Sequence, residues 1–221
     1  MSPQLFALLS DATLQTLLMV GVAGGLASLA GIPLGLFLAL TGPGDLLPRP
    51  MLQRSVGLVV NAARSTPFII LVVAIVPLTR AITGTSIGTA AATVPLTLAA
   101  VPFIARVVEA AVREVDRGLV EAAQAMGASP GQIVAKVLLP EARAGILRGL
   151  TLAAVSLVGY SAMVGAVGGG GLGDLGIRYG YQRFMPEMML AVVLILVVLV
   201  QLLQSGGEAL ARHLDKRTPI R

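Results

Sequence analysis

The side chains that could contact a small polar solute gather on one predicted helix near residue 160. Ser156, Tyr160 and Met163 share a helical face at spacings of four and three residues, and Ser161 follows Tyr160. A path for a small zwitterion needs a few hydroxyls and a flexible apolar gate, which these four side chains would supply. The same face also suits a seam between two copies of the chain, because membrane helix interfaces use similar residues. Both interpretations stay open.

The sequence offers no residues for catalysis or for binding a metal or a nucleotide. It has no cysteine, and its one histidine, His213, lies in a basic tail. The residues needed for a metal site built from cysteine and histidine, or for a Ser-His-Asp triad, are therefore absent from the sequence. Lys136 and Lys216 are followed by Val and Arg, so neither belongs to a P-loop. We therefore expect no catalytic residue, no metal ligand and no cofactor in this chain. A transport protein with neither a P-loop nor an acidic residue inside its membrane helices must take its energy from a partner, and a passive channel or a structural subunit stays open as an alternative.

The composition is that of a membrane protein. Of the 221 residues, 56% are hydrophobic and 12% are charged, and the mean hydropathy is +0.88. An average soluble domain has about 25% charged residues. The low charge excludes a disordered chain and disfavours a soluble globule.

Five stretches without Asp, Glu, Lys or Arg predict five membrane helices. A helix that spans a bilayer needs about 20 apolar residues, and four of the stretches are long enough. The shortest, 65–79, reaches this length if the helix extends back past Arg64, whose side chain then snorkels to the membrane face. The predicted fold is an all-α membrane protein with helices at roughly 17–40, 56–79, 82–106, 150–170 and 187–207.

The basic residues predict the orientation of these helices. All Lys and Arg other than Arg80, Arg178 and Arg183 fall on one side, which the positive-inside rule assigns to the cytoplasm. The N-terminus is then outside, and the loop 107–149 and the basic tail 211–221 are cytoplasmic. The net charge of +5 follows from this topology and does not require a nucleic-acid partner. No Lys or Arg precedes Arg49, so we do not expect a cleavable signal peptide.

The long cytoplasmic loop contains two short helical patterns that predict an elbow between the third and fourth helices. The first, near 117–126, ends at Gly127, a residue suited to a helix C-terminus. The second begins with Ser129 as N-cap, Pro130 at the first helical position and Gln132 completing a capping box.

The first helix of this elbow has small residues where a water-exposed helix would be polar. Ala122, Ala123 and Gly127 present little side chain, so a partner's surface could come close, and Glu121 supplies a charge that orients it. Met126 adds an exposed apolar side chain. Two alternatives remain open: an amphipathic helix on the lipid interface, or one tucked under its own bundle.

Glycine and proline interrupt or perturb the predicted helices. Close helix packing is predicted by glycines four apart at Gly21/Gly25, Gly31/Gly35 and Gly165/Gly169. The run Gly168–Gly171 predicts a tight turn or a flexible gate near the outer face.

Two further groups of side chains have less specific interpretations. We expect an aromatic belt at the membrane interface from Tyr179, Tyr181 and Phe184. Asn61, Arg64 and Thr66, at the inner end of the predicted second helix, either brace the elbow or snorkel to the membrane face, and both interpretations stay open.

The loop also resembles a known motif. Glu121–Ala122–Ala123, three residues, Gly127, nine residues, then Val137, Leu138, Leu139 and Pro140 is similar to the EAA loop of ABC importer permeases, with Val137 in place of the usual Ile. The stretches 61–88, 94–109, 121–142 and 157–181 resemble the permease subunits of methionine importers. The resemblance covers residues 11–210, which reads as one permease domain.

This resemblance implies a homodimer of five-helix subunits in the bacterial inner membrane. Such dimers sit on two copies of a cytoplasmic ATPase, which binds the ATP and Mg. They receive methionine from an extracytoplasmic methionine-binding lipoprotein, in the L-form, with the D-form left open. The elbow fits a cleft on the ATPase, and closure of the ATPase pair drives alternating access. The implied docking residues are Glu121, Ala122, Ala123, Met126, Gly127, Val137, Leu139 and Pro140.

Two alternatives to a methionine importer stay open. The same architecture could import another amino acid or small solute, because specificity largely lies in the separate binding protein. A channel or secondary transporter without partners would tolerate changes in the loop. Asp174, Arg178 and Arg183 add charge to the outer loop relative to the family and could alter docking of the binding protein.

Overall fold

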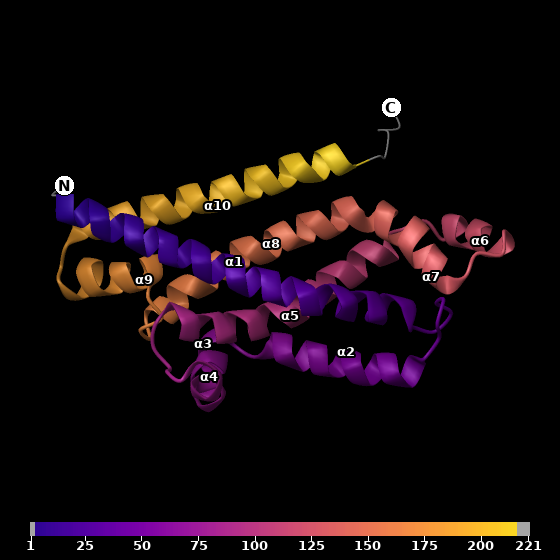
Figure 1. The fold of residues 1–221 in the computed structure, drawn as a ribbon, viewed down its shortest axis with the longest axis horizontal. Helices are drawn as coiled ribbons and strands as arrows, with labels where there is room; N and C mark the ends of the chain where they lie inside the picture. Colours follow the sequence, from indigo (N-terminus) through magenta and orange to yellow (C-terminus); the bar gives the residue numbers. More distant parts are fainter. Residues whose placement is uncertain (1–2, 216–221) are drawn as a thin grey trace.

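A computed structural model describes residues 3–215, and this part of the chain is helical with no strand. The long helices run along one axis of an elongated bundle (Figure 1). They are α1 (Pro3–Leu40), α5 (Thr89–Arg113), α8 (Leu139–Gly165) and α10 (Pro186–Leu214). Short elements complete the chain: α2 (Pro50–Ser65), α3 (Phe68–Ala74), α4 (Val76–Thr83), α6 (Arg117–Ala125), α7 (Pro130–Ile133), η1 (Val134–Leu138), α9 (Gly171–Leu175) and η2 (Gly176–Gln182).

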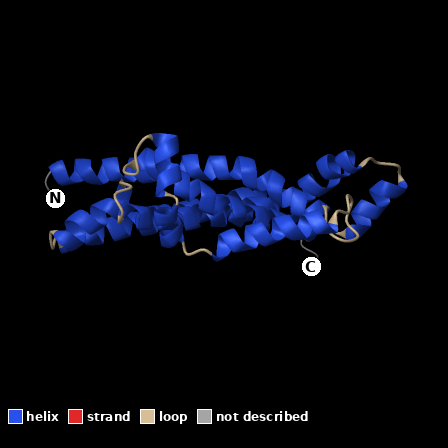
Figure 2. Ribbon diagram, turned by 90° about the horizontal axis from the view of Figure 1, so that it is seen from below, coloured by secondary structure: helices blue, strands red, loops and turns tan. Residues whose placement is uncertain are grey.

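The expected class, an all-helical membrane protein, is confirmed. Four helical runs in the described part are long and apolar enough to cross a membrane, and α2 with α3 makes a fifth if this bent pair is one span. The short helices α6 and α7 project from one end of the bundle, and the N-terminal end of α1 lies at the opposite end (Figure 2).

The first and last predicted helices are longer in the structure than charge-free stretches suggest. α1 ends at Leu40 as predicted but begins at Pro3 rather than near 17, because Asp11 stays in the helix and accepts a hydrogen bond from Gln15 at 2.8 Å. α10 begins at Pro186 and continues to Leu214, into the predicted tail 211–221. Residues 216–221 of that tail lie outside the described residues.

The prediction of one continuous second helix over 56–79 is wrong. The helix starts earlier, at Pro50, and is broken at Thr66–Pro67, where the axes of α2 and α3 differ by 100°. Pro67 has no N–H to donate, and its ring forces the preceding residue out of the helical region, so Thr66 is extended with φ −75 and ψ 122. A second break at Ile75 separates α3 from α4.

The third and fourth helices are displaced from their predicted ranges of 82–106 and 150–170. α5 cannot begin before Thr89, because Gly84 and Gly88 have positive φ, and it continues to Arg113. α8 is the end of a longer run from Pro130 and stops at Gly165, since Gly168 and Gly170 again have positive φ. The polar loop is therefore shorter than 107–149.

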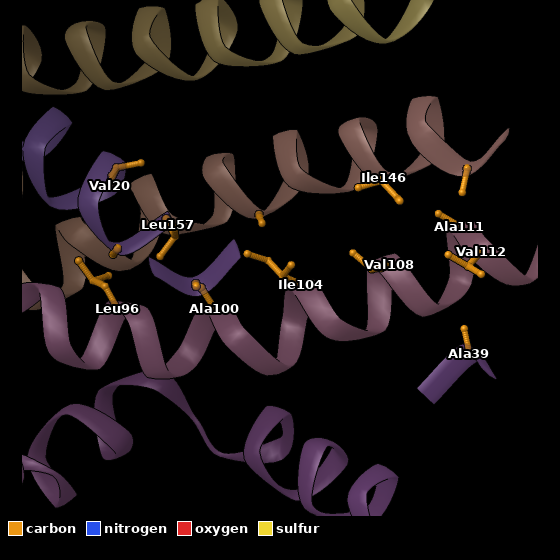
Figure 3. Packing of buried hydrophobic residues seen from close by; sticks show 14 of the residues in the cluster. Val20, Ala39, Leu96, Ala100, Ile104, Val108, Ala111, Val112, Ile146 and Leu157 are labelled. Atoms are coloured by element: carbon orange, nitrogen blue, oxygen red, sulfur yellow. The ribbon is translucent and has the colours of Figure 1, made fainter. Parts of the chain in front are cut away.

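The core lies between α1, α5 and α8, where Leu96, Ile104 and Leu157 are almost fully buried (Figure 3). Gly31 and Gly35 bring α1 directly against α5, because a Cβ on Gly35 would lie 2.5 Å from the carbonyl oxygen of Ala105. This confirms close packing for that pair. A Cβ on Gly21 or Gly25 would meet nothing within 4 Å, so those glycines are not used inside the subunit.

Candidate functional site

The elbow begins with α6, whose two ends are fixed by local hydrogen bonds. The N-cap residue Asp116 accepts a hydrogen bond from the Gly118 N–H at 2.7 Å. At the other end Gly127 has φ +78, and the N–H groups of Gly127 and Ala128 donate to the carbonyls of Gln124 and Ala123. This pair of bonds is a Schellman motif, so the predicted helix end at Gly127 is confirmed.

The second arm of the elbow starts as predicted but does not end as a separate helix. Ser129 and Gln132 form the capping box: the Ser129 N–H donates to Gln132 Oε1 at 2.9 Å and the Gln132 N–H donates to Ser129 Oγ at 3.4 Å. From Pro130 the chain then runs without a break into α8. A wide π turn, η1, precedes Pro140, since proline offers no N–H for a regular α-helical bond there.

The eight predicted docking residues fall into two groups in the structure. Those that face outward include Met126, which is 82% exposed. The outward group is Glu121, Ala122, Met126, Gly127 and Pro140. The inward group is Ala123, which is buried, with Val137 and Leu139, which are half-buried against the main core. One group is available to a partner, and the other packs into the core of its own subunit.

A pocket of about 230 Å³ separates α6 from the loop that follows α1. Its charged and polar lining comprises Asp45, Arg113, Arg117, Glu121 and Gln124. The elbow therefore meets the bundle through a small polar cavity beside the apolar contacts of its inward residues.

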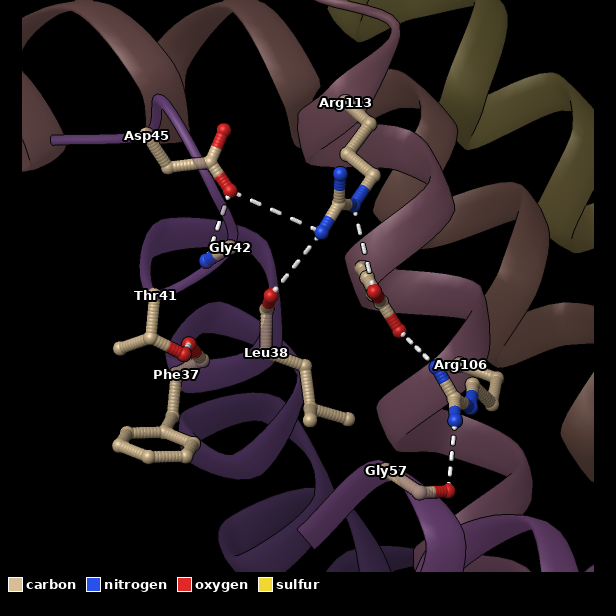
Figure 4. Close-up of polar contacts among 9 residues, drawn as sticks. Phe37, Leu38, Thr41, Gly42, Asp45, Gly57, Arg106 and Arg113 are labelled. Carbon is tan, nitrogen blue, oxygen red and sulfur yellow. Dashed lines mark hydrogen bonds and ion pairs between the residues drawn. The ribbon is translucent and has the colours of Figure 1, made fainter. Parts of the chain in front are cut away.

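Behind the pocket lies a charged network that sequence reasoning missed (Figure 4). Glu109 is only 7% exposed and pairs with Arg106 at 2.5 Å and with Arg113 at 3.2 Å. Arg113 also lies 3.7 Å from Asp45. Arg106, Glu109 and Arg113 were assigned to the predicted loop or its border rather than to one helix. Their spacing of three and four residues, which identifies the network on a helix, was therefore not used.

The predicted path residues on α8 divide between its exposed and buried sides. Ser156, Tyr160 and Met163 share the more open side of α8, where Met163 is 49% exposed and Ser156 and Tyr160 are half-buried. Ser161 is 2% exposed and donates to the Val158 carbonyl at 2.7 Å. The Tyr160 ring stacks on Phe68 of α3, with centroids 4.4 Å apart. Phe68 follows the Pro67 break, and nothing in the sequence pattern pairs it with Tyr160.

Of the two roles left open for Asn61, Arg64 and Thr66, bracing of the elbow is wrong. These residues lie at the end of α2 that is farther from the elbow (Figure 1). The Thr66 hydroxyl donates instead to the Ala62 carbonyl of its own helix at 3.3 Å.

At the opposite end of the bundle, the run Gly168–Gly171 forms a tight turn pinned to α1. The N–H groups of Gly171 and Leu172 donate to Gln15 Oε1 and Thr16 Oγ1, each at 2.9 Å. These bonds favour a fixed turn over a flexible gate.

The aromatic side chains beyond this turn are partly exposed. Tyr181 is 68% and Phe184 is 87% exposed, as an interfacial belt requires. Arg183 lies over the Tyr179 ring at 4.4 Å, and Arg178 is paired with Asp174. Among the described residues no cluster of His, Asp or Glu could hold a metal ion.

Residues 31–219 match the family described as the binding-protein-dependent transport system inner membrane component. Because the match covers most of the chain, the protein belongs to this family. A relative from Vibrio cholerae, the probable D-methionine transport system permease protein MetI, is 55% identical over 97% of both chains. The D-methionine transport system permease protein MetI of Escherichia coli K12 is 50% identical over 75% of this chain and 76% of its own.

Solved structures agree with this assignment. A chain of the methionine ABC transporter MetNI in an inward-facing conformation superposes with a TM-score of 0.95 and 48% identity, covering 97% of this chain and 99% of that one. A chain of an amino acid ABC transporter solved with histidines has a TM-score of 0.74 and 20% identity, over 94% of both chains, so it shares the fold.

Proposed function

We propose that this protein is the permease subunit of an ATP-driven methionine importer. It works as a homodimer, with two copies of a cytoplasmic ATPase and an extracytoplasmic methionine-binding lipoprotein. The observation that carries the proposal is the superposition on the MetNI chain at a TM-score of 0.95 over nearly the whole length, with the exposed elbow included. The 55% identity to the probable D-methionine permease of Vibrio cholerae supports the same substrate class.

In this proposal the elbow is the docking site for the ATPase. Ala122 and Gly127 let the partner's surface come close, and Glu121 and Met126 supply a charge and an apolar anchor. The fixed caps of α6 and α7 suit this role, because a docking element must be rigid to transmit movement. The ATPase binds the ATP and Mg, so this subunit has no nucleotide site and needs no cofactor of its own.

The proposed orientation has the N-terminus outside and the elbow and chain end in the cytoplasm. The elbow lies at one end of the bundle and the start of α1 at the other (Figure 2). At the elbow end of α8, Arg143 donates to the Leu214 carbonyl and Arg148 pairs with Asp215. These contacts place the end of α10 on the same side as the elbow, in line with the basic residues there.

The exposed side of α8 is the proposed wall of the translocation path. Ser156, Tyr160 and Met163 lie there, and in the dimer they would face the second copy. Ser161, buried behind them, supports this face from inside the subunit. The Tyr160–Phe68 stack joins the path to the broken helix α2–α3, so a bend at Pro67 would move the wall.

Co-purification and uptake test this function. The protein is tagged at its C-terminus, extracted from its native membrane with its companions, and reconstituted in proteoliposomes. We expect an ATPase at about equal stoichiometry and ATP-dependent uptake of labelled methionine when the binding protein is added. An ATPase without methionine uptake would contradict the substrate, and ATP-independent uptake with no ATPase would contradict the importer class.

A further inference from the structure

The charged network at the cytoplasmic end of the bundle joins three helices that otherwise share few polar contacts. Glu109 bridges Arg106 and Arg113 along α5. Arg106 Nη2 donates to the Gly57 carbonyl of α2 at 2.8 Å, and Arg113 Nη2 donates to the Leu38 carbonyl of α1 at 3.2 Å. The two guanidinium groups therefore leave α5 in different directions, one toward each neighbouring helix (Figure 4).

The network is charge-balanced, and it is only partly buried: Glu109 is largely shielded from solvent, whereas the Arg113 side chain is 42% exposed. Arg106 and Arg113 face Glu109 and, at 3.7 Å, Asp45 of the loop after α1. A buried ion pair contributes little stability unless all its partners are in place, because burial removes water from each charge. Four charges at one junction point to a task other than stability alone.

The hydrogen bond from Arg106 to the Gly57 carbonyl of α2 matters most, because few other contacts hold α2 against the bundle. Only Gly57 and Val60 of α2 are buried, and its apolar side chains Met51, Leu58 and Val59 are at least 65% exposed. α2 also ends at the Pro67 break, so α3 does not carry it as a straight extension. Arg106 is thus the polar tether between α2 and the bundle.

The other side of the network leads to the elbow. Arg113 is the last residue of α5, and α6 begins at Arg117, so only Glu114–Asp116 intervene. Arg113 also lines the pocket beside α6. Movement imposed on α6 therefore reaches the network over less than one helical turn of chain.

We propose that Arg106, Glu109 and Arg113 form a coupling triad, a set of positioning residues that makes α2 and α1 move with α5 and the elbow as one body. The inference rests on the proposed function, in which α6 receives the movement of the ATPase. With the triad intact, ATP hydrolysis is converted into reorientation of the path. Without it, α6 moves while α2 stays behind, and hydrolysis continues with little transport.

The test compares uptake per ATP hydrolysed in the reconstituted complex of permease, ATPase and binding protein. Arg106→Lys keeps the charge but removes the fork that reaches Glu109 and the Gly57 carbonyl together. We expect normal recovery of the ATPase and continued hydrolysis, with methionine uptake per ATP reduced by about tenfold, a common size for coupling between sites. Arg212→Gln, which removes the exposed Arg212–Glu208 pair of α10, is the matched control and should leave the ratio unchanged.

A double variant separates coupling from simple charge balance. Glu109→Gln leaves two arginines without their shared partner, whereas Arg106→Gln with Glu109→Gln restores neutrality but still lacks the bond to Gly57. The triad predicts low uptake per ATP in both. Recovery of the ratio in the double variant would overturn the proposal, because charge balance alone would then explain the network.

Other outcomes are equally decisive. A wild-type ratio in Arg106→Lys overturns the triad, as does loss of ATPase binding in that variant, which would make Arg106 part of the docking surface. If the wild-type complex contains no ATPase, the proposed function itself fails, a result that no triad variant can mimic.

A distance measurement that leaves the triad residues unaltered tests the proposal even if the triad variants fail to fold. The chain has no cysteine, so spin labels can be placed at Arg54 of α2 and Leu119 of α6 in dimers with one labelled copy. We expect the same label-to-label distance in nucleotide-free and ATP-bound complexes. A distance that changes with nucleotide would overturn the one-body proposal.

Discussion

The two ends of the bundle are both tied to α1, but by different chemistry. At the elbow end, Arg113 binds the Leu38 carbonyl as part of a network of four charged groups. At the other end, Gly171 and Leu172 are held by the uncharged side chains of Gln15 and Thr16. Charged groups act over a longer range and can link several helices at once, whereas single neutral bonds fix one turn in one place. The elbow end is therefore linked to several helices through charged groups, whereas the end at the Gly168–Gly171 turn is fixed locally by neutral hydrogen bonds.

The largest expected effect is loss of transport after substitution of the docking face. Gly127→Trp places a large side chain where the partner comes close, and at φ +78 the backbone there also disfavours a side chain. Glu121→Lys reverses the orienting charge. We expect both variants to abolish methionine uptake while the protein remains folded in the membrane, measured by uptake and by membrane yield.

Gly206→Trp is the control for added bulk, because Gly206 of α10 has open space around it and no positive φ. It should reach the membrane and still bind the ATPase. Normal uptake by Gly127→Trp and Glu121→Lys at normal expression would remove the elbow from the docking site.

The next largest effect concerns the close contact between Gly35 of α1 and helix α5. Gly35→Ala places a Cβ 2.5 Å from the Ala105 carbonyl oxygen, so α1 and α5 must separate. Overpacking of this kind costs about 1–3 kcal/mol. Gly25→Ala has nothing within 4 Å and should be neutral or slightly stabilising. Thermal unfolding in detergent compares the pair, and equal midpoints would contradict the rigid α1–α5 contact.

The end of the bundle at the Gly168–Gly171 turn can be tested by removing one hydroxyl. Thr16→Val removes the acceptor of the Leu172 N–H, and Leu172 is fully buried. An unpaired buried N–H costs about 1–3 kcal/mol. Thr13→Val is the control, since the Thr13 hydroxyl only donates to the Leu9 carbonyl of its own helix. The unfolding midpoint should fall for Thr16→Val and stay at the wild-type value for Thr13→Val. Equal midpoints for the two variants would show that other contacts hold the turn.

Which features the sequence predicted and which it missed depends on how far apart along the chain the interacting residues lie. The caps at Ser129 and Gly127 depend on neighbours within five residues, so their residue types sufficed. The break at Pro67 is also local, but a charge-free stretch conceals it, because hydropathy does not register a missing N–H. The Glu109 network was missed because Glu109 and Arg113 were assigned to a loop, while Arg106 fell at the end of the predicted helix 82–106.

Contacts across long separations could not be read from the pattern at all. Gly171 meets Gln15, and Tyr160 stacks on Phe68, only because several helices lie in the right order and register. No spacing rule in a single sequence encodes such pairs.

The smallest expected effect follows from removal of the helix cap at the elbow itself. Ser129→Ala removes the hydroxyl that accepts the Gln132 N–H at the start of α7, and loss of such a cap costs about 1 kcal/mol of helix stability. Since α7 continues into α8, the loss should loosen only the turn at residues 126–129 and leave global unfolding nearly unchanged. We expect faster hydrogen exchange at the Gln132 amide and a modest decrease in ATPase affinity. Ser129→Asp, which can cap in the same way, should restore both. If Ser129→Ala instead lowered the global unfolding midpoint as much as Gly35→Ala, the elbow would be part of the folding core rather than a rigid projection from it.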